Sequence, residues 1–130
     1  MCIAAIGFGM LLTEESCKPT AAIATKTNNE KISVALSQFE NKNTLIVKNS
    51  SLEYDILLVK KTATEYTALQ MRCTHRGADL KLKDDKLSCP AHGSVFDFDG
   101  QVLESPASSP LTKFPVELKG NQIIINLKKS

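Results

Sequence analysis

Two short stretches decide the fold of this chain: CTHRGA at residues 73–78 and CPAHGSVF at residues 89–96. Each stretch holds one cysteine and one histidine in a loop that follows an apolar run, so each loop can offer one thiolate and one imidazole to a metal. Glycine lies one or two positions after each histidine, and glycine allows the backbone to turn tightly around a bulky group. Thirteen residues separate the two pairs, and the four candidate metal ligands are Cys73, His75, Cys89 and His92.

The ligand types alone do not choose the metal, because thiolates and imidazoles suit both zinc and iron–sulfur clusters. Zinc sites usually pair two cysteines in one turn and two histidines on a helix, whereas here each turn is mixed. The spacing therefore favours an iron–sulfur centre. A zinc site of two cysteines and two histidines, or four structural residues without a metal, are the alternatives.

The two loops resemble the Rieske iron–sulfur family, whose pattern is C-x-H-x-G in the first loop and C-P-x-H-G followed by serine or tryptophan in the second. The resemblance continues through Phe96 and Gly100, through a loop stiffened by Pro106 and Pro110, and through a closing strand pair, so that it covers residues 32–127. It implies a mainly β fold, a Rieske-type antiparallel sandwich of small stacked sheets with a cluster-binding subdomain.

The resemblance also implies the cofactor and its ligands. The cofactor is a [2Fe-2S] cluster, with Cys73 and Cys89 on one iron and His75 and His92 on the other, which lies nearer solvent. Ser94 occupies the position of a serine that donates a hydrogen bond to sulfur in the family. Neutral imidazoles in place of two thiolates raise the reduction potential to roughly −150 to +300 mV, against about −400 mV for plant-type ferredoxins.

Departures from the family pattern indicate which type of Rieske protein this chain resembles. Quinol-oxidising members carry a second cysteine in each loop, joined as a disulfide, at the positions of Ala78 and Ala91 in this chain. They also carry a tyrosine at the position of Phe96. The resemblance therefore implies a potential between those of low-potential ferredoxins and those of quinol oxidases.

Charged residues near the loops allow two interpretations each. Arg76 is either a solvated residue or one that steers an acidic redox partner. Lys81, Lys83 and Lys86 alternate with leucines, which is typical of a half-buried hairpin, although they could also form a basic docking rim. A trimmed hairpin is expected around Asp84-Asp85.

The rest of the chain predicts a single, mainly β domain. Its length of 130 residues fits one domain, and 42% hydrophobic and 23% charged residues are ordinary for a globular protein. A helix is indicated only at residues 33–39 and in the apolar segment at residues 1–12. Strands are indicated by apolar runs at residues 45–47, 56–59, 66–69, 116–118 and 123–125, separated by Asn, Asp and Gly turns.

The first 31 residues predict a leader and a tether, and the domain is expected to occupy residues 32–130. Residues 1–12 carry no charge, and Cys17 follows a small residue as in a bacterial lipoprotein site. We therefore expect a periplasmic protein, attached to the membrane through this segment or through a lipidated Cys17. The alternative for the apolar segment is a buried or partner-bound helix. The alternative for the location is the cytoplasm. Residues 20–31 are polar, as in a tether.

Composition and histidine count limit the function. A net charge of +2, from interspersed charges, gives no field suited to nucleic acid. The CTHRG form is common in aromatic-ring oxygenases, but those enzymes need a further iron held by two histidines, and this chain has only two histidines in total. We therefore expect no catalysis by the chain alone.

Three functions are consistent with these observations. The first is a one-electron carrier between a reductase and a terminal redox enzyme, with redox proteins as partners. The second is a tightly bound Rieske small subunit of a larger membrane-associated or periplasmic oxidoreductase. The third is a binding module or redox sensor, against which the intact ligand set argues.

Overall fold

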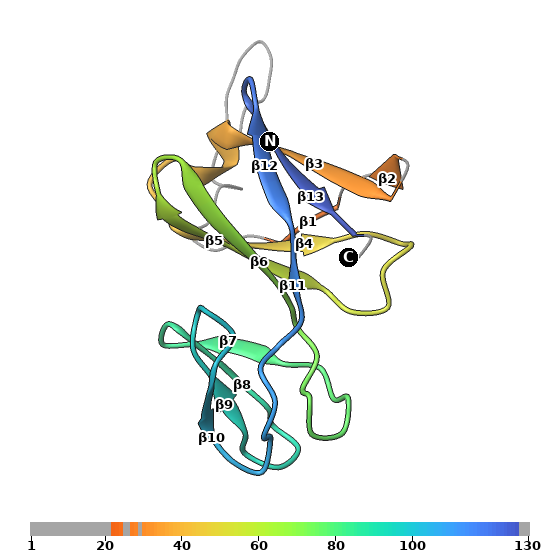
Figure 1. Cartoon of the computed structure of the whole chain (residues 1–130), viewed down its shortest axis with the longest axis vertical. Coiled ribbons are helices and arrows are strands. Elements are labelled where there is room, and N and C mark those ends of the chain that lie inside the picture. The colour runs from red at the N-terminus through yellow and green to blue at the C-terminus, as the bar shows by residue number, and fades with distance from the viewer. Residues whose placement is uncertain (1–21, 25–26, 29, 128–130) are drawn as a thin grey trace, which may run out of the picture.

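The computed structural model describes residues 22–24, 27–28 and 30–127, and they form three small β-sheets (Figure 1). Every strand pair is antiparallel except β1 with β4. The mainly β fold expected from the sequence is confirmed. In the part of the chain described, no helix is long and apolar enough to cross a membrane.

The first two sheets lie together in the upper part of the view, and we call them the base (Figure 1). The first has the order β1-β4-β5-β6-β11, with β1 at Ala22–Ala24, β4 at Thr44–Lys48, β5 at Ile56–Thr62, β6 at Glu65–Gln70 and β11 at Lys113–Phe114. The second has the order β12-β13-β3-β2, with β2 at Thr27–Asn28, β3 at Lys31–Ala35, β12 at Val116–Lys119 and β13 at Gln122–Asn126.

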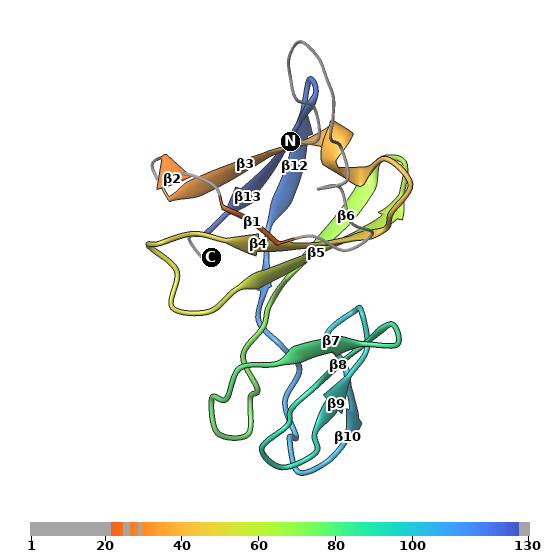
Figure 2. The same ribbon diagram turned by 180° about the vertical axis from the view of Figure 1, so that it is seen from behind.

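The third sheet belongs to a separate lobe that hangs below the base, and we call it the cluster subdomain (Figure 2). Its order is β10-β9-β8-β7, with β7 at Lys81–Lys83, β8 at Lys86–Ser88, β9 at Val95–Phe96 and β10 at Val102–Glu104. Its strands are only two or three residues long, so loops make up most of this lobe.

Two parts of the chain differ from the sequence expectation. The helix expected at residues 33–39 is wrong in its first half, because β3 runs to Ala35 and only Leu36–Phe39 form a short 3-10 helix. Ile32 and Val34 are buried, whereas Lys31 and Ser33 are exposed, and this period of two suits a strand. Within the expected tether, β1 pairs with β4 and β2 pairs with β3. Residues 1–21, with the expected leader, Cys2 and Cys17, lie outside the described residues.

Strand β5 explains how the base supports the cluster subdomain. Residues 56–59 are all buried, and alternate side chains enter two different cores. Ile56 and Leu58 join the base core, together with Ile32, Val34, Phe39, Leu45, Val47, Ala68, Phe114, Ile123 and Ile125. Leu57 and Val59 join the cluster-side core, together with Leu69, Met71, Cys73, Leu80, Leu87, Cys89, Phe96, Ala107 and Leu111.

The hairpin of β7 and β8 has its turn at Asp84-Asp85, where the sequence predicts a hairpin. Its two turn residues, Asp84 and Asp85, both have positive φ values, 50° and 63°, as a two-residue hairpin turn requires. Leu80 and Leu87 are buried in the cluster-side core. The alternation with exposed Lys81, Lys83 and Lys86 is therefore that of a half-buried hairpin.

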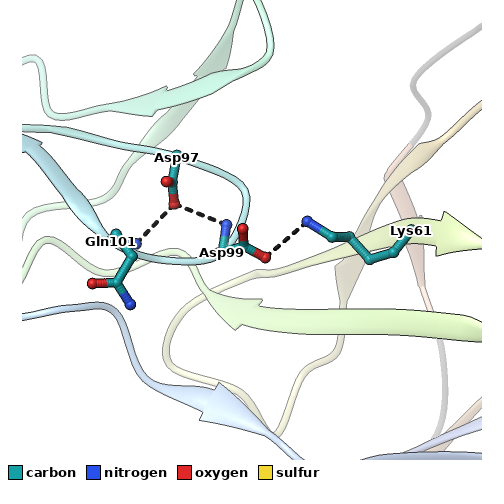
Figure 3. A network of polar contacts seen from close by, with 4 residues as sticks. All are labelled: Lys61, Asp97, Asp99 and Gln101. Carbon is teal, nitrogen blue, oxygen red and sulfur yellow. Dashed lines mark hydrogen bonds and ion pairs between the residues drawn. The ribbon is translucent and has the colours of Figure 1, made fainter.

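An exposed ion pair connects the two lobes (Figure 3). Lys61 Nζ of β5 lies 2.8 Å from Asp99 Oδ1, in the turn between β9 and β10. That turn is ordered by Asp97 Oδ1, which accepts hydrogen bonds from the backbone N–H groups of Asp99 and Gln101, both at 2.9 Å.

Candidate metal centre

The two cysteine–histidine loops have the same backbone design. In the first loop, between β6 and β7, Cys73 N–H donates to Ala78 O and Gly77 N–H donates to Cys73 O, both at 2.8 Å. In the second, between β8 and β9, Cys89 N–H donates to Ser94 O at 2.8 Å and Gly93 N–H donates to Cys89 O at 2.9 Å. Each loop is thus a closed turn that begins at its cysteine.

A glycine makes each of these turns possible. Gly77 has a φ of +79° and Gly93 a φ of +89°, in the left-handed region that L-residues with a side chain rarely adopt. The sequence prediction that glycine allows a tight turn near each histidine is confirmed by these angles.

The two cysteine–histidine loops, which follow β6 and β8, lie at the end of the molecule farthest from the β12–β13 hairpin (Figure 1). Cys73 and Cys89 are buried free thiols. His75 is half-buried and His92 is exposed, with their ring centroids 5.2 Å apart and their planes at 89°. The two thiols are therefore less exposed than the two imidazoles.

His75 has a polar atom that needs a partner. Its Nδ1 is buried and makes no hydrogen bond within the described part of the chain. A buried nitrogen without a partner costs free energy, and coordination of a metal removes that cost. This atom fits the position of an iron ligand.

The surroundings of Cys73 favour its thiolate, which is the form that binds metal. Burial raises the pKa of the Cys73 thiol, but hydrogen bonds outweigh burial and hold that pKa below its ordinary value. In decreasing order of effect, the partners are the backbone of His75, the side chains of Cys89 and Ser94, and the backbone of Arg76.

Ser94 is fully buried, and its hydroxyl makes two contacts. Its Oγ accepts a hydrogen bond of 3.0 Å from Ala107 N–H, so the hydroxyl proton remains for another acceptor. The hydrogen bond between Ser94 and Cys73 uses that proton. Phe96, also fully buried, brings no hydroxyl to the site.

A third loop, at residues 105–112, closes the site. Besides the bond from Ala107 to Ser94, Thr74 Oγ1 donates to Ser109 O at 2.6 Å. Both contacts join the third loop to a cluster loop. Sequence reasoning named the prolines of this segment but not Thr74 or Ala107, and no sequence signal marks partners 35 and 13 positions apart.

The fold and the paired loops define a small β protein with two matching loops, each carrying one cysteine and one histidine, residue types that suit a metal centre. The Rieske [2Fe-2S] domain model matches residues 31–115, and the chain belongs to this family. Its cofactor is therefore the Rieske [2Fe-2S] cluster, which the buried thiols and the unpartnered His75 nitrogen fit, and not the zinc ion kept as an alternative.

Similar proteins include a ferredoxin subunit of a dioxygenase and an iron-sulfur subunit of a cytochrome complex. The chain is 37% identical over 71 residues to the 3-phenylpropionate/cinnamic acid dioxygenase ferredoxin subunit of Shigella boydii, which covers 51% of this chain and 67% of the relative. It is 27% identical over 75 residues to the cytochrome b6-f complex iron-sulfur subunit of Chlorobaculum tepidum, covering 56% of this chain and 41% of that subunit.

The fold is also similar to that of a chain in the solved complex of reduced oxygenase and oxidized ferredoxin in carbazole 1,9a-dioxygenase. The matched chain is 25% identical, with a TM-score of 0.60, and the match covers 79% of this chain and 98% of that chain.

Proposed function

We propose that this protein is a small one-electron carrier between a reductase and a terminal oxygenase. The single observation that carries the proposal is the match of the two loops: the side chain of Cys89 is hydrogen-bonded to Cys73, and the rings of His75 and His92 lie 5.2 Å apart. The bound [2Fe-2S] cluster supplies a centre that takes up and releases one electron at a time.

The ligand assignment follows the burial of the four side chains. Cys73 and Cys89 would hold the less exposed iron, because their thiols belong to the cluster-side core. His75 and His92 would hold the other iron, because their rings lie 5.2 Å apart and His92 is exposed. Exposure of His92 gives a partner protein close access to the outer ligands, and electron transfer needs such access.

The relatives support the choice of partners. The Shigella boydii relative is named as a ferredoxin subunit of a dioxygenase, and the similar solved structure is a complex of a ferredoxin with an oxygenase. The absence of cysteine at Ala78 and Ala91 separates this chain from quinol-oxidising subunits with a disulfide. A tightly bound small subunit is the second candidate, supported by the likeness to a cytochrome b6-f complex subunit.

For location, we propose an extracytoplasmic protein that is lipid-anchored at Cys17, with a cytoplasmic protein as the alternative. The proposal is supported by the uncharged first twelve residues and the small residue before Cys17. Expression of the full chain with a radiolabelled fatty acid tests it. Label that disappears in Cys17→Ala supports the anchor, and an unlabelled protein of full mass in the cytoplasm overturns it.

The carrier proposal is tested with the purified full chain. We expect equal amounts of iron and acid-labile sulfide, and a rhombic electron paramagnetic resonance signal on reduction. We also expect stopped-flow reduction by a flavin reductase and reoxidation by an oxygenase of the ring-hydroxylating class. Zinc without sulfide would overturn the metal assignment. Permanent co-purification with a large partner, without turnover as a free protein, would favour the second candidate.

A further inference from the structure

The first cluster loop, residues 73–78, is held from outside by contacts with the connection between β4 and β5, which we call the brace. Tyr54 lies in the connection between β4 and β5, and its Oη donates a hydrogen bond of 2.7 Å to Gly77 O. One residue further on, Asp55 O accepts a hydrogen bond of 2.8 Å from Met71 N–H, just before Cys73. The connection therefore contacts the loop at its start and near its end.

Arg72 completes this brace. Its guanidinium carbon lies 5.6 Å from the centre of the Tyr54 ring, within the range of a cation–π interaction. A Cβ atom placed on Gly77 would lie 3.2 Å from Arg72 Nη2 and 3.4 Å from Tyr54 Oη. The guanidinium group and the phenol therefore both lie against the backbone of Gly77, which has no side chain to push them away.

In the described part of the chain, no aromatic or cationic side chain lies against Gly93 of the second loop, although the backbone hydrogen bonds of the two loops are alike. A Cβ atom placed on Gly93 would meet nothing within 4 Å among the residues described. The brace is thus not a general requirement of this turn. It is a feature of the loop that carries Cys73 and His75.

The charge of Arg72 and the hydroxyl of Tyr54 both affect the energy of an electron added to the centre. A positive charge beside the loop stabilises a more negative centre by Coulomb attraction. The Tyr54 hydroxyl compensates the negative end of the Gly77 carbonyl, which would otherwise repel added negative charge. The Gly77–Ala78 peptide bond is trans, so fixing this carbonyl also fixes Ala78 N–H, which points the opposite way within the same peptide plane.

We propose that Tyr54 and Arg72 are positioning residues that hold the first cluster loop and raise the reduction potential of the centre. This inference rests on the electron-transfer function and adds residues that set its driving force. Tyr54 acts through the Gly77 carbonyl. Arg72 acts through its charge, which stacking on Tyr54 keeps against the loop.

Four variants of the full chain separate these effects. Tyr54→Phe removes only the hydroxyl, and Tyr54→Leu also removes the ring on which Arg72 stacks. Arg72→Gln removes the charge, and Arg72→Lys keeps the charge without the planar group.

Two controls match these changes elsewhere in the base. Tyr66→Phe removes the hydroxyl of a tyrosine whose ring packs edge-on against Phe39, with centroids 5.2 Å apart. Lys119→Gln removes one positive charge from the end of β12, at the β12–β13 turn.

The readout is the reduction potential of each purified protein at an electrode, with the spectrum of the reduced centre recorded alongside. We expect Tyr54→Phe and Arg72→Gln each to lower the equilibrium constant for reduction of the centre by about two- to tenfold. Tyr54→Leu should weaken it at least as much as Tyr54→Phe, Arg72→Lys should recover part of the loss, and the two controls should match the wild type.

Unchanged potentials in Tyr54→Phe and Arg72→Gln, with intact centres, would overturn the proposal. So would equal shifts in the two controls. If Tyr54→Phe fails to assemble the centre while Tyr66→Phe succeeds, the positioning role is supported, and Arg72→Lys against Arg72→Gln still tests the charge. Because an electrode needs no protein partner, these results stay separate from failure of transfer to an oxygenase.

Discussion

The base and the cluster subdomain share strand β5 but are stabilised in different ways. The base has strands of up to seven residues, and the buried members of its core are all apolar. The cluster subdomain has strands of two or three residues, and its core includes two thiols, with the one buried polar side chain of the described residues, Ser94, beside them. The base can be held by apolar burial alone, whereas the smaller lobe has loops that must be cross-linked.

This difference predicts that the cluster contributes to the folding of one lobe and not of the other. A group bound by two loops stabilises the folded form of those loops, because the unfolded chain offers no preformed site. The base, with its long β3–β13 and β5–β6 pairings, does not depend on that bond. The following experiments test this comparison.

The largest effect is expected for Cys89→Ala, which removes an inner ligand. The cluster should be lost, and amide hydrogens of β7–β10 should exchange about a hundredfold faster or more, while those of β5 and β13 stay protected. Hydrogen exchange followed by mass spectrometry measures both lobes at once. Ser88→Ala, at the neighbouring half-buried position, is the control and should keep the cluster. Equal loss of protection in both lobes would show that they fold as one unit.

Neighbouring leucines of β5 provide a sharper comparison. Leu57 and Leu58 are both fully buried, but Leu57 belongs to the cluster-side core and Leu58 to the base core. Each change to Ala should lower the free energy of unfolding by about 2–5 kcal/mol. Leu57→Ala should also speed the loss of the cluster's visible absorption on heating, and Leu58→Ala should destabilise the base with less effect on that rate. Identical cluster lifetimes would contradict the separation of the two cores.

These two leucines also show what the sequence can predict. The apolar run at residues 56–59 predicts a buried strand, and the structure confirms it. The run does not say which leucine faces which core, because a strand covered on both faces has no alternation of polar and apolar residues. At residues 33–39 the helix prediction is wrong in its first half, because β3 pairs with β13 there. Only Leu36 and Phe39 have a helical spacing, and they lie in the short 3-10 helix.

The mainly β fold predicted from the sequence is confirmed, and the four candidate ligands stay a prediction that the geometry of their two loops supports. Local spacing identified Cys73, His75, Cys89 and His92, because each loop is a closed turn made within six residues. Ser94 was named through the family resemblance. Tyr54 could not be found, because it contacts Gly77 from 23 positions away and lies in a connection without any motif.

Ser94→Ala tests the polar part of the cluster-side core. The change leaves Ala107 N–H without its acceptor and should cost about 1–3 kcal/mol of stability. It also removes the hydrogen bond to Cys73, so the potential should fall, because less positive charge faces the sulfur. Voltammetry and urea unfolding measure the two effects, with the exposed Ser108→Ala as control. An unchanged potential would show that the hydroxyl proton does not point to the site.

The smallest effect on stability is expected for Asp99→Asn, which removes the Lys61–Asp99 ion pair between the lobes. The hydrogen bond and charge of Lys61 lower the pKa of Asp99, against a slight opposing effect of desolvation and with some help from Lys113. A carboxyl group whose pKa is lower in the folded protein contributes stability above its unfolded pKa of about 3.9, and loses that contribution as the pH falls through the folded value. Asp99→Asn should therefore lower the urea midpoint slightly at pH 7 and leave it unchanged near the acid limit of the folded state.

The pair Lys48–Asp55 is the matched comparison, because its 2.7 Å contact lies within the base. Since Lys61 and Asp99 join the two lobes, Asp99→Asn should speed amide exchange in the β9–β10 turn more than in β5, and Asp55→Asn should leave that turn unchanged. About 1 M salt should remove most of the Asp99→Asn effect on stability, because both partners are exposed to solvent and such pairs are screened. A difference that persists at high salt would instead assign the effect to the backbone of the turn, which Asp97 orders through Asp99 and Gln101 N–H.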